Sequence, residues 1–145
     1  MNSPTVGAAV EDLVRYLGFH QTGAEISAKQ DRRYWRIAYR VLHSRVEQAV
    51  AQALHSGQHR IALVARTLGM GERTLQRRLS ERGLTFNDVV DQVRERLARQ
   101  NVARDDVTLT EVAFLLGYSE SSAFIRAFRR WTGETPLAYR KRALA

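Results

Sequence analysis

The chain of 145 residues contains no cysteine, which excludes a disulfide framework, a thiolate metal site and cysteine-based catalysis. It has no apolar run near the roughly 18 residues that a membrane-spanning helix requires. Its first ten residues lack the basic and apolar regions of a signal peptide. Proline occurs only at Pro4 and Pro136, so the chain between them is free to form helices. We therefore expect about one domain, cytoplasmic, with no membrane partner.

Lysine is nearly absent, although the chain is basic. Among the 23 basic residues only Lys29 and Lys141 are lysines, the other 21 are arginines, and against 15 acidic residues the net charge is +8. Residues 58–145 hold 16 basic and 10 acidic residues and so carry most of the excess. This balance indicates a polyanionic partner, but charge alone does not distinguish DNA, RNA and an acidic protein.

Apolar residues recur at three- and four-residue steps along most of the chain, as Leu42, Val46 and Val50 do. This spacing is the period of an amphipathic helix. No segment shows the alternation of a strand followed by a hairpin turn. The sequence therefore predicts an all-α fold with about seven helices in its C-terminal two-thirds.

The apolar series occurs twice. Residues 64–70 match residues 112–118 at an offset of 48. The following helix matches at an offset of 49, where the aligned residues are Leu75, Arg77 and Leu79 with Phe124, Arg126 and Phe128. Each copy predicts a short helix, a turn at a glycine and a second helix, which is the helix-turn-helix layout. One copy would be as typical of any packed helical hairpin, and the repetition favours helix-turn-helix.

The repeat also predicts where the elements begin and end. We expect the first helix-turn-helix at about 61–83, a linker helix at about 85–101 and the second helix-turn-helix at about 109–132. Thr110 is expected to cap the first helix of the second copy, and Gly71 and Ser119 are expected to cap the two second helices.

The second helix of each copy carries outward-facing residues that suit recognition of DNA. Such a helix enters the major groove, where arginine can bond guanine, and glutamine adenine, through two hydrogen bonds. The candidate base-reading residues are Arg73, Gln76, Arg77, Ser121, Ser122 and Arg126, and Ile125 is also expected to face outward. The candidate phosphate-binding residues are Arg78, Arg82, Arg129 and Arg130.

The alternative for each of these arginines is a solvated charge or a helical ion pair, such as Glu95 with Arg99. Ordinary solvated charge is the role expected of the arginines in and after the linker helix, namely Arg94, Arg96, Arg99 and Arg104. The four histidines stand near no ligand-type partners, and no phosphate loop or grouping of serine, histidine and acid is present. We therefore expect no metal, no cofactor and no enzymatic activity.

Several of these stretches closely resemble the DNA-binding domain of the AraC/XylS family of transcription regulators. They are residues 68–70, 73–79 and 117–119, the stretch SAFIRAFRRWTGETP at 122–136, and residues 139–140. The resemblance covers roughly residues 41–142 and implies two homeodomain-like helix-turn-helix subdomains held by a rigid linker helix. It further implies that both recognition helices enter successive major grooves of one duplex. The family's base-reading positions fall on the six residues named above.

Residues 1–40 precede the DNA-binding domain, which is expected at 41–145, and align with no part of the family. This N-terminal segment is expected to be partly helical, and its role stays open. Val10, Leu13, Val14 and Leu17 form one short amphipathic stretch. The aromatic-rich segment 34–41 is expected to begin a helix that packs on the domain, with a dimer contact as the alternative.

Together the residues and the resemblance predict a transcription regulator that binds double-stranded DNA at specific sequences. The resemblance alone implies that it is an activator that contacts RNA polymerase. One alternative is a short interaction module that binds polymerase or a full-length family member without reading promoter DNA, and another is a non-specific nucleoid binder. The sequence leaves the operator, the sign of regulation, any effector and the oligomeric state open.

Overall fold

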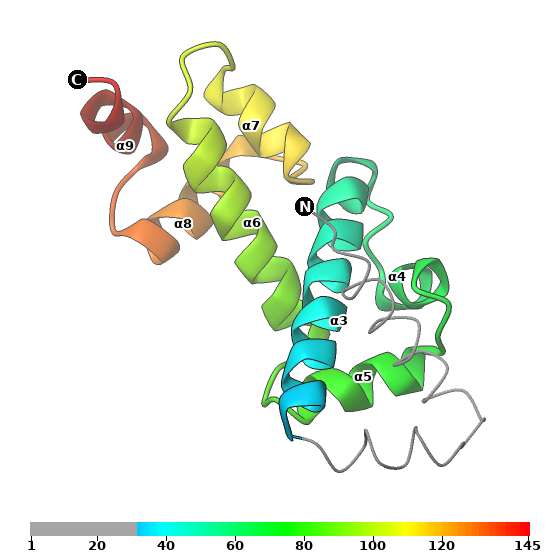
Figure 1. The fold of residues 1–145 in the computed structure, drawn as a ribbon. Coiled ribbons are helices and arrows are strands. Elements are labelled where there is room, and N and C mark those ends of the chain that lie inside the picture. Colours follow the sequence, from blue (N-terminus) through cyan, green and yellow to red (C-terminus); the bar gives the residue numbers. More distant parts are fainter. Residues whose placement is uncertain (1–31) are drawn as a thin grey trace, which may run out of the picture.

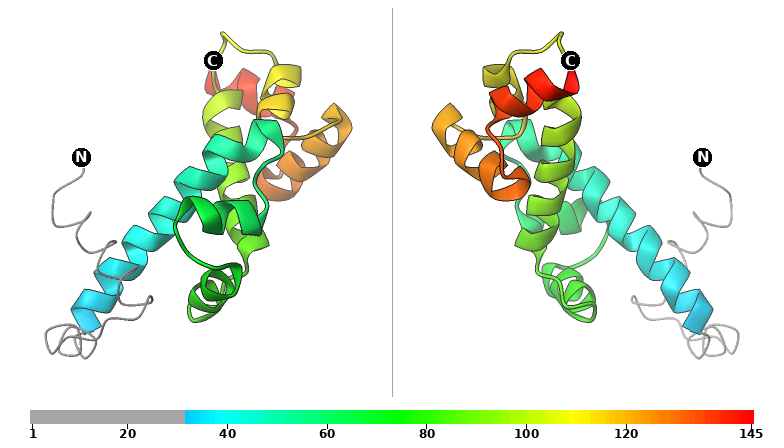
Figure 2. Two further views of the ribbon diagram at one scale, coloured as in Figure 1. Left: turned by 90° about the vertical axis from the view of Figure 1, so that its right-hand side faces the viewer. Right: turned by 90° about the vertical axis from the view of Figure 1, so that its left-hand side faces the viewer.

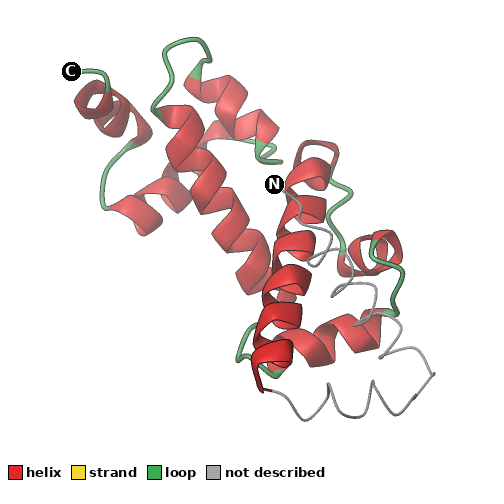
Figure 3. Cartoon of the chain, viewed as in Figure 1, coloured by secondary structure: helices red, strands yellow, loops and turns green. Residues whose placement is uncertain are grey.

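The computed structural model describes residues 32–145, and every regular element in that range is a helix (Figures 1 and 3). In chain order the elements are α3 (Arg32–Ala53), the 3-10 helix η1 (Leu54–Ser56), α4 (Ile61–Thr67), α5 (Glu72–Ser80), α6 (Phe86–Val102), α7 (Leu109–Leu115), α8 (Ser121–Thr132) and α9 (Pro136–Ala143). Seven α-helices without a strand across residues 32–145 confirm the predicted all-α fold. The amphipathic stretch between Val10 and Leu17 lies outside the described residues.

Helix α6 lies between two groups of helices (Figure 1). On one side it packs against α3, which contacts α4, and α4 in turn packs against α5. On the other side it contacts α7, α8 and α9. The start of α3 projects away from the other helices in both views of Figure 2. The segment from η1 to α5 and the pair α7–α8, here called the first and second units, therefore lie on either side of one helix, and η1 contacts α7 directly.

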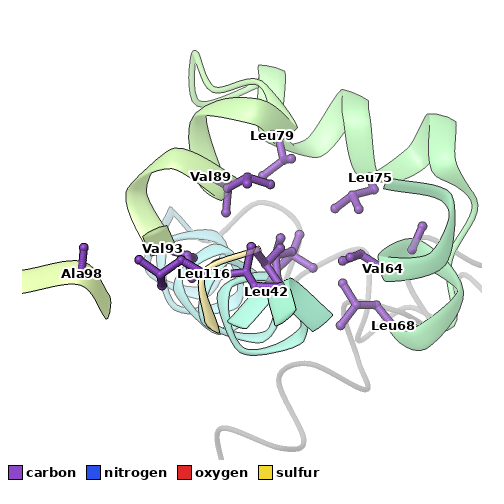
Figure 4. Close-up of a cluster of buried hydrophobic side chains, with 14 of the residues drawn as sticks. Leu42, Val64, Leu68, Leu75, Leu79, Val89, Val93, Ala98 and Leu116 are labelled. Carbon is purple, nitrogen blue, oxygen red and sulfur yellow. The ribbon is translucent and has the colours of Figure 1, made fainter. Parts of the chain in front are cut away.

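One cluster of buried apolar side chains extends through both units. In the first unit it is aliphatic, and its members there include Val64, Leu68, Leu75 and Leu79 (Figure 4). In the second unit it also contains aromatic rings: Phe124 lies 5.8 Å from Phe128 between ring centroids, and Phe128 meets Tyr139 of α9 edge-on at 5.2 Å. Burying each such side chain stabilises the fold by about 1.5–3 kcal/mol. These interiors explain the periodicity of the sequence.

The turn of each unit contains a glycine with a left-handed backbone, as the repeat predicts. Gly69 has φ +72° and Gly117 has φ +85°, a region that side chains with a Cβ rarely adopt. The next residue, Met70 or Tyr118, is half-buried and packs against the core. A glycine and a following apolar side chain therefore form both turns.

The cap predicted at Thr110 is wrong, because Thr108 caps α7. The Thr108 hydroxyl accepts a hydrogen bond from the backbone N–H of Glu111 at 3.1 Å. In return, the Glu111 carboxylate accepts one from the backbone N–H of Thr108 at 3.0 Å. This reciprocal pair needs an acidic or amide side chain three residues after the cap, a condition that Thr108 meets and Thr110 does not.

The other helix starts differ among themselves. Gly71 stands at the N-cap position of α5 as predicted. Ser119 does not cap α8, which begins at Ser121 after Glu120, and the Glu120 side chain makes no capping hydrogen bond. The linker helix α6 has a full reciprocal cap, because the Thr85 hydroxyl accepts from the backbone N–H of Asp88 at 3.1 Å and the Asp88 carboxylate accepts from that of Thr85 at 2.8 Å.

Candidate nucleic-acid interface

The outer face of α5 carries three polar side chains because its inner face is fixed in the core. Leu75 and Leu79 are fully buried one turn apart. A helix that buries these two positions turns the intervening residues toward solvent, and Arg73, Gln76 and Arg77 are all exposed. The structure thus brings the three predicted residues of the first unit together on one exposed face.

Helix α8 presents the equivalent face of the second unit. Phe124 and Phe128 are buried, and Ser121, Ser122 and Arg126 are exposed. The Ser122 hydroxyl lies 3.5 Å from the carboxylate of Glu120, which precedes the helix. The three predicted residues of the second unit are therefore also accessible on one helix.

The four arginines predicted to flank these faces differ in their surroundings. Arg129 is exposed, and the exposed Arg130 has Asp91 at 3.9 Å. The guanidinium of Arg82 stacks on the ring of Tyr39, with 4.4 Å between its central carbon and the ring centroid. Arg78 is more enclosed, with 16% of its side chain exposed, and it donates to the Glu81 carboxylate at 3.2 Å. The ion pair with Glu81 thus occupies a side chain that the sequence predicts to bind phosphate.

Two arginines of α6 contradict the expectation of ordinary solvated charge. Arg94 is half-buried, and its Nε donates to the backbone carbonyl of Leu116 at 3.1 Å. Arg99 is also half-buried; it donates to Glu95 at 3.1 Å, which confirms that ion pair, and to the carbonyl of Trp131 at 3.2 Å. The partners Leu116 and Trp131 lie in the second unit, so both arginines bind the linker helix to that unit.

The other two arginines in and after the linker helix are exposed, as the expectation of solvated charge requires. Arg96 is exposed and donates to Glu47 of α3 at 2.8 Å. Arg104 is exposed in the loop after α6 and pairs with Asp106 at 2.5 Å. Hydrogen bonding to Arg104 holds the pKa of the Asp106 carboxyl below its ordinary value. Both arginines are thus exposed partners of surface carboxylates.

The arginines on the outer faces of α5 and α8 have different surroundings from those of the linker helix. Within residues 32–145, no carboxylate pairs with Arg73, Arg77, Arg126 or Arg129, and no carbonyl accepts a hydrogen bond from their side chains. Guanidinium groups that meet no protein acceptor keep all their donors available to a ligand. The unpaired arginines of the described chain thus include those on the outer faces of α5 and α8.

Each unit also has a shallow groove beside its second helix. The first groove is lined by residues that include Gln76, Ser80 and Thr85. The second is lined by residues that include Ser121, Ile125 and Thr135. Ile125 follows Gln76 by the repeat offset of 49 and is 41% exposed. Ile125 is thus exposed as the sequence predicts, and the repeat offset is the signal that aligns it with Gln76.

The described part of the chain offers little else that could bind a ligand. Residues 32–145 contain no group of three or more histidine or acidic side chains placed to hold a metal ion. Within the same range, no helix is long and apolar enough to cross a membrane. The histidine His59 lies beside an arginine, with 3.5 Å between its Nε2 and Nη2 of Arg94.

Two short helices joined by a glycine turn, repeated about a linker helix, define a tandem helix-turn-helix domain. The comparisons with known proteins agree: a family model described as "Helix-turn-helix domain" matches residues 64–142. The chain belongs to this family, and its resemblance to AraC-type DNA-binding domains is confirmed.

Similar proteins include the ornithine utilization regulator of Pseudomonas aeruginosa, which is 48% identical over 77 residues. That alignment covers 53% of this chain and 23% of the relative. The transcriptional regulator VirS of Mycobacterium tuberculosis is 41% identical over 99 residues, which cover 68% of this chain and 29% of VirS. The chain thus spans about a quarter of the length of these relatives.

Solved structures show the same architecture. The transcriptional regulator CdpR of Pseudomonas aeruginosa is 38% identical, with a TM-score of 0.55 over 79% of this chain and 37% of that chain. A DNA-binding transcriptional dual regulator of Escherichia coli has a TM-score of 0.58 over 68% of this chain and 92% of that chain, at 24% identity. This second likeness supports the fold alone.

Proposed function

We propose that the protein is a transcription regulator that binds double-stranded DNA at specific sequences through α5 and α8. The observation that carries the proposal is the division among its arginines. Arg94 and Arg99 are engaged with backbone carbonyls inside the domain. In contrast, Arg77 and Arg126 are exposed on the second helices of the two helix-turn-helix units, and in this motif the second helix enters the major groove. A major groove supplies the acceptors that these exposed side chains lack in the protein.

In this proposal each recognition helix reads one of two successive major grooves. Base edges are contacted by Arg73, Gln76, Arg77, Ser121, Ser122 and Arg126. Phosphates are contacted by Arg78, Arg82, Arg129 and Arg130, which give affinity without sequence information. Arg78 would have to exchange Glu81 for a phosphate, so we expect it to contribute less than Arg129, which has no such ion pair. The site of action is the cytoplasm, on nucleoid DNA.

The test compares a site selected from a random DNA pool with random DNA, over a range of salt concentrations. Arg77→Ala and Arg126→Ala are each expected to weaken binding to the selected site by about 1–3 kcal/mol, because each removes one bidentate base contact. Binding to random DNA should change far less. Arg104→Ala, which removes a loop arginine paired with Asp106, is the matched control. Equal weakening on all DNA would contradict the assignment of base-reading roles.

We further infer that the protein activates transcription by contacting RNA polymerase. Beyond the family resemblance, this rests on α7, where Phe114 is 66% and Leu115 is 47% exposed. The first unit has Arg66 and Thr67 at the aligned positions, so the second unit exposes apolar surface where the first does not. Exposed apolar side chains next to one another are a feature of protein contact sites.

Replacing Phe114 by arginine and Leu115 by threonine gives the second unit the residues of the first. DNA binding by this variant should be unchanged, and stimulation of transcription in a purified system should be lost. A wild-type chain that forms a complex with polymerase yet shows no preference for any DNA sequence would instead support the alternative function, a protein-interaction module.

A further inference from the structure

The two units approach each other closely at the turn of the second unit. A Cβ atom added to Gly117 would lie 2.5 Å from the backbone oxygen of Leu54, the first residue of η1. Real Cβ atoms do not come so close to a backbone oxygen. Gly69, the aligned glycine of the first unit, has nothing within 4 Å of the same added atom. Gly117 therefore serves a contact between units as well as its own turn.

Arg94 lies at the centre of this contact. Its Nε donates to the carbonyl of Leu116 at 3.1 Å, and its guanidinium carbon lies 4.9 Å from the ring centroid of Tyr118. Its Nη2 lies 3.5 Å from Nε2 of His59 in the loop that leads into α4. One side chain from the linker helix thus touches a segment of each unit.

The contacts of Arg94 are partly shielded from solvent by buried neighbours. Leu54 and Leu116, which border it, are buried at 0% and 2% exposure within the shared apolar cluster. Burial, and secondarily the charge of Arg94, lower the pKa of His59 and favour the neutral ring that can accept from a guanidinium. A hydrogen bond shielded from water is stronger than one at the surface, so the units are joined by more than the linker helix.

We propose that Arg94, Gly117, Leu54, His59, Leu116 and Tyr118, here called the Arg94 joint, fix the position of α8 relative to α5 and thereby set the spacing between the two half-sites on DNA. The inference rests on the proposed function for its biological meaning. Arg94 is a positioning residue and touches no base. One added base pair rotates the second half-site by about 34° and moves it by about 3.4 Å, which a rigid pair of helices cannot follow.

The first experiment measures affinity for a selected site and for sites with one base pair added or removed between its halves. The wild-type chain should lose about tenfold or more in Kd on either change, or about 1.4 kcal/mol. Arg94→Ala should bind the three sites within about threefold of one another. Arg94→Lys, which has no planar fork for the carbonyl and the ring, should be intermediate. Arg96→Ala, which removes an exposed arginine of the same helix, is the control and should keep the wild-type preference.

The two aligned glycines give a second, matched pair of variants. Gly117→Ala and Gly69→Ala both place a Cβ at a positive φ and should both lower thermal stability. Only Gly117→Ala inserts an atom between the units, so only this variant should lose the preference for the original spacing. Melting curves show whether each variant is folded before its DNA binding is compared.

The joint can also be tested without DNA. The chain has no cysteine, so Ala62→Cys and Lys141→Cys introduce spin labels at exposed positions on α4 and α9. The distribution of label distances should be narrow in the otherwise wild-type chain and clearly broader with Arg94→Ala. Unchanged distance distributions together with an unchanged spacing preference would overturn the inference. A wild-type chain with no sequence preference would contradict the proposed function. In that case the label distances would still show whether the Arg94 joint fixes the two units relative to each other.

Discussion

Ile125 occupies in the second unit the place that Gln76 occupies in the first. Both line the groove beside their helix, and both are exposed. Glutamine can read adenine by hydrogen bonds, whereas an apolar side chain in the major groove can contact the methyl group of thymine. The two units therefore offer different chemistry at an equivalent position, and the second half-site is expected to contain a thymine that Ile125 touches.

This prediction can be tested by changing one methyl group on the DNA. Replacing the contacted thymine of the selected site by deoxyuridine should weaken wild-type binding by about 0.8 kcal/mol, the value of one buried carbon. The same replacement should leave the affinity of Ile125→Ala unchanged, because that variant has already lost the side-chain atoms beyond Cβ that touch the thymine methyl. Leu144→Ala, which truncates another exposed aliphatic side chain, should respond to deoxyuridine as wild-type does.

His59 gives a second prediction, for the dependence of stability on pH. Its pKa in the folded chain is lowered from the ordinary value of 6.5 by burial and by Arg94. As the pH falls below about 6.5, the unfolded chain takes up a proton at this site before the folded chain does. The free energy of unfolding should therefore decrease as the pH falls through this range.

Urea denaturation between about pH 7.5 and 5.5 measures this contribution. His59→Gln should show a smaller decrease of stability toward low pH than the wild-type chain. His55→Gln replaces an exposed histidine four residues away and should follow the wild-type curve. A His59→Gln curve parallel to that of wild-type would show that the ring does not resist protonation in the folded chain.

At the scale of elements, the start of α7 contains two threonines, of which only Thr108 caps the helix. Thr108→Ala removes a reciprocal cap and should lower the free energy of unfolding by about 1 kcal/mol. Thr110→Ala replaces an exposed residue inside the first turn and should stay within about 0.5 kcal/mol of wild-type. Equal losses in the two variants, measured by urea denaturation, would contradict the observed cap.

The helices and their faces could be predicted because both depend on local order. The 3.6-residue period places Leu75 and Leu79 inward, and this alone turns Arg77 outward. The left-handed turns at Gly69 and Gly117 follow from the repeat in the same way. The cap of α7 was missed although its signal was local: Glu111 stands three residues after Thr108.

The roles of Arg94 and Arg99 could not be predicted, because they depend on contacts far away along the chain. Arg94 bonds a carbonyl 22 residues later, and Arg99 bonds one 32 residues later. No pattern within α6 distinguishes these two arginines from Arg96, whose side chain reaches a surface carboxylate. Only the packing of the second unit on the linker helix decides which arginine becomes part of the interior.

At the scale of the whole molecule, the net charge of +8 and the positions of the charges make different predictions for DNA binding. If net charge governed affinity, any arginine would be worth the same. If position governs it, only arginines that meet phosphates release counterions, and each of these contributes about 0.9 to the slope of log K against log salt concentration.

Arg129→Gln and Arg104→Gln distinguish the prediction from net charge from the prediction from charge position, because both variants lower the net charge by the same amount. Arg129 is exposed on the recognition helix α8 without a carboxylate partner in the described chain, whereas Arg104 pairs with Asp106 in a loop. Salt titrations should therefore show a slope smaller by about 0.9 for Arg129→Gln and an unchanged slope for Arg104→Gln. Equal reductions would mean that the protein attracts DNA through its overall field, and α8 would then lose its proposed phosphate contact.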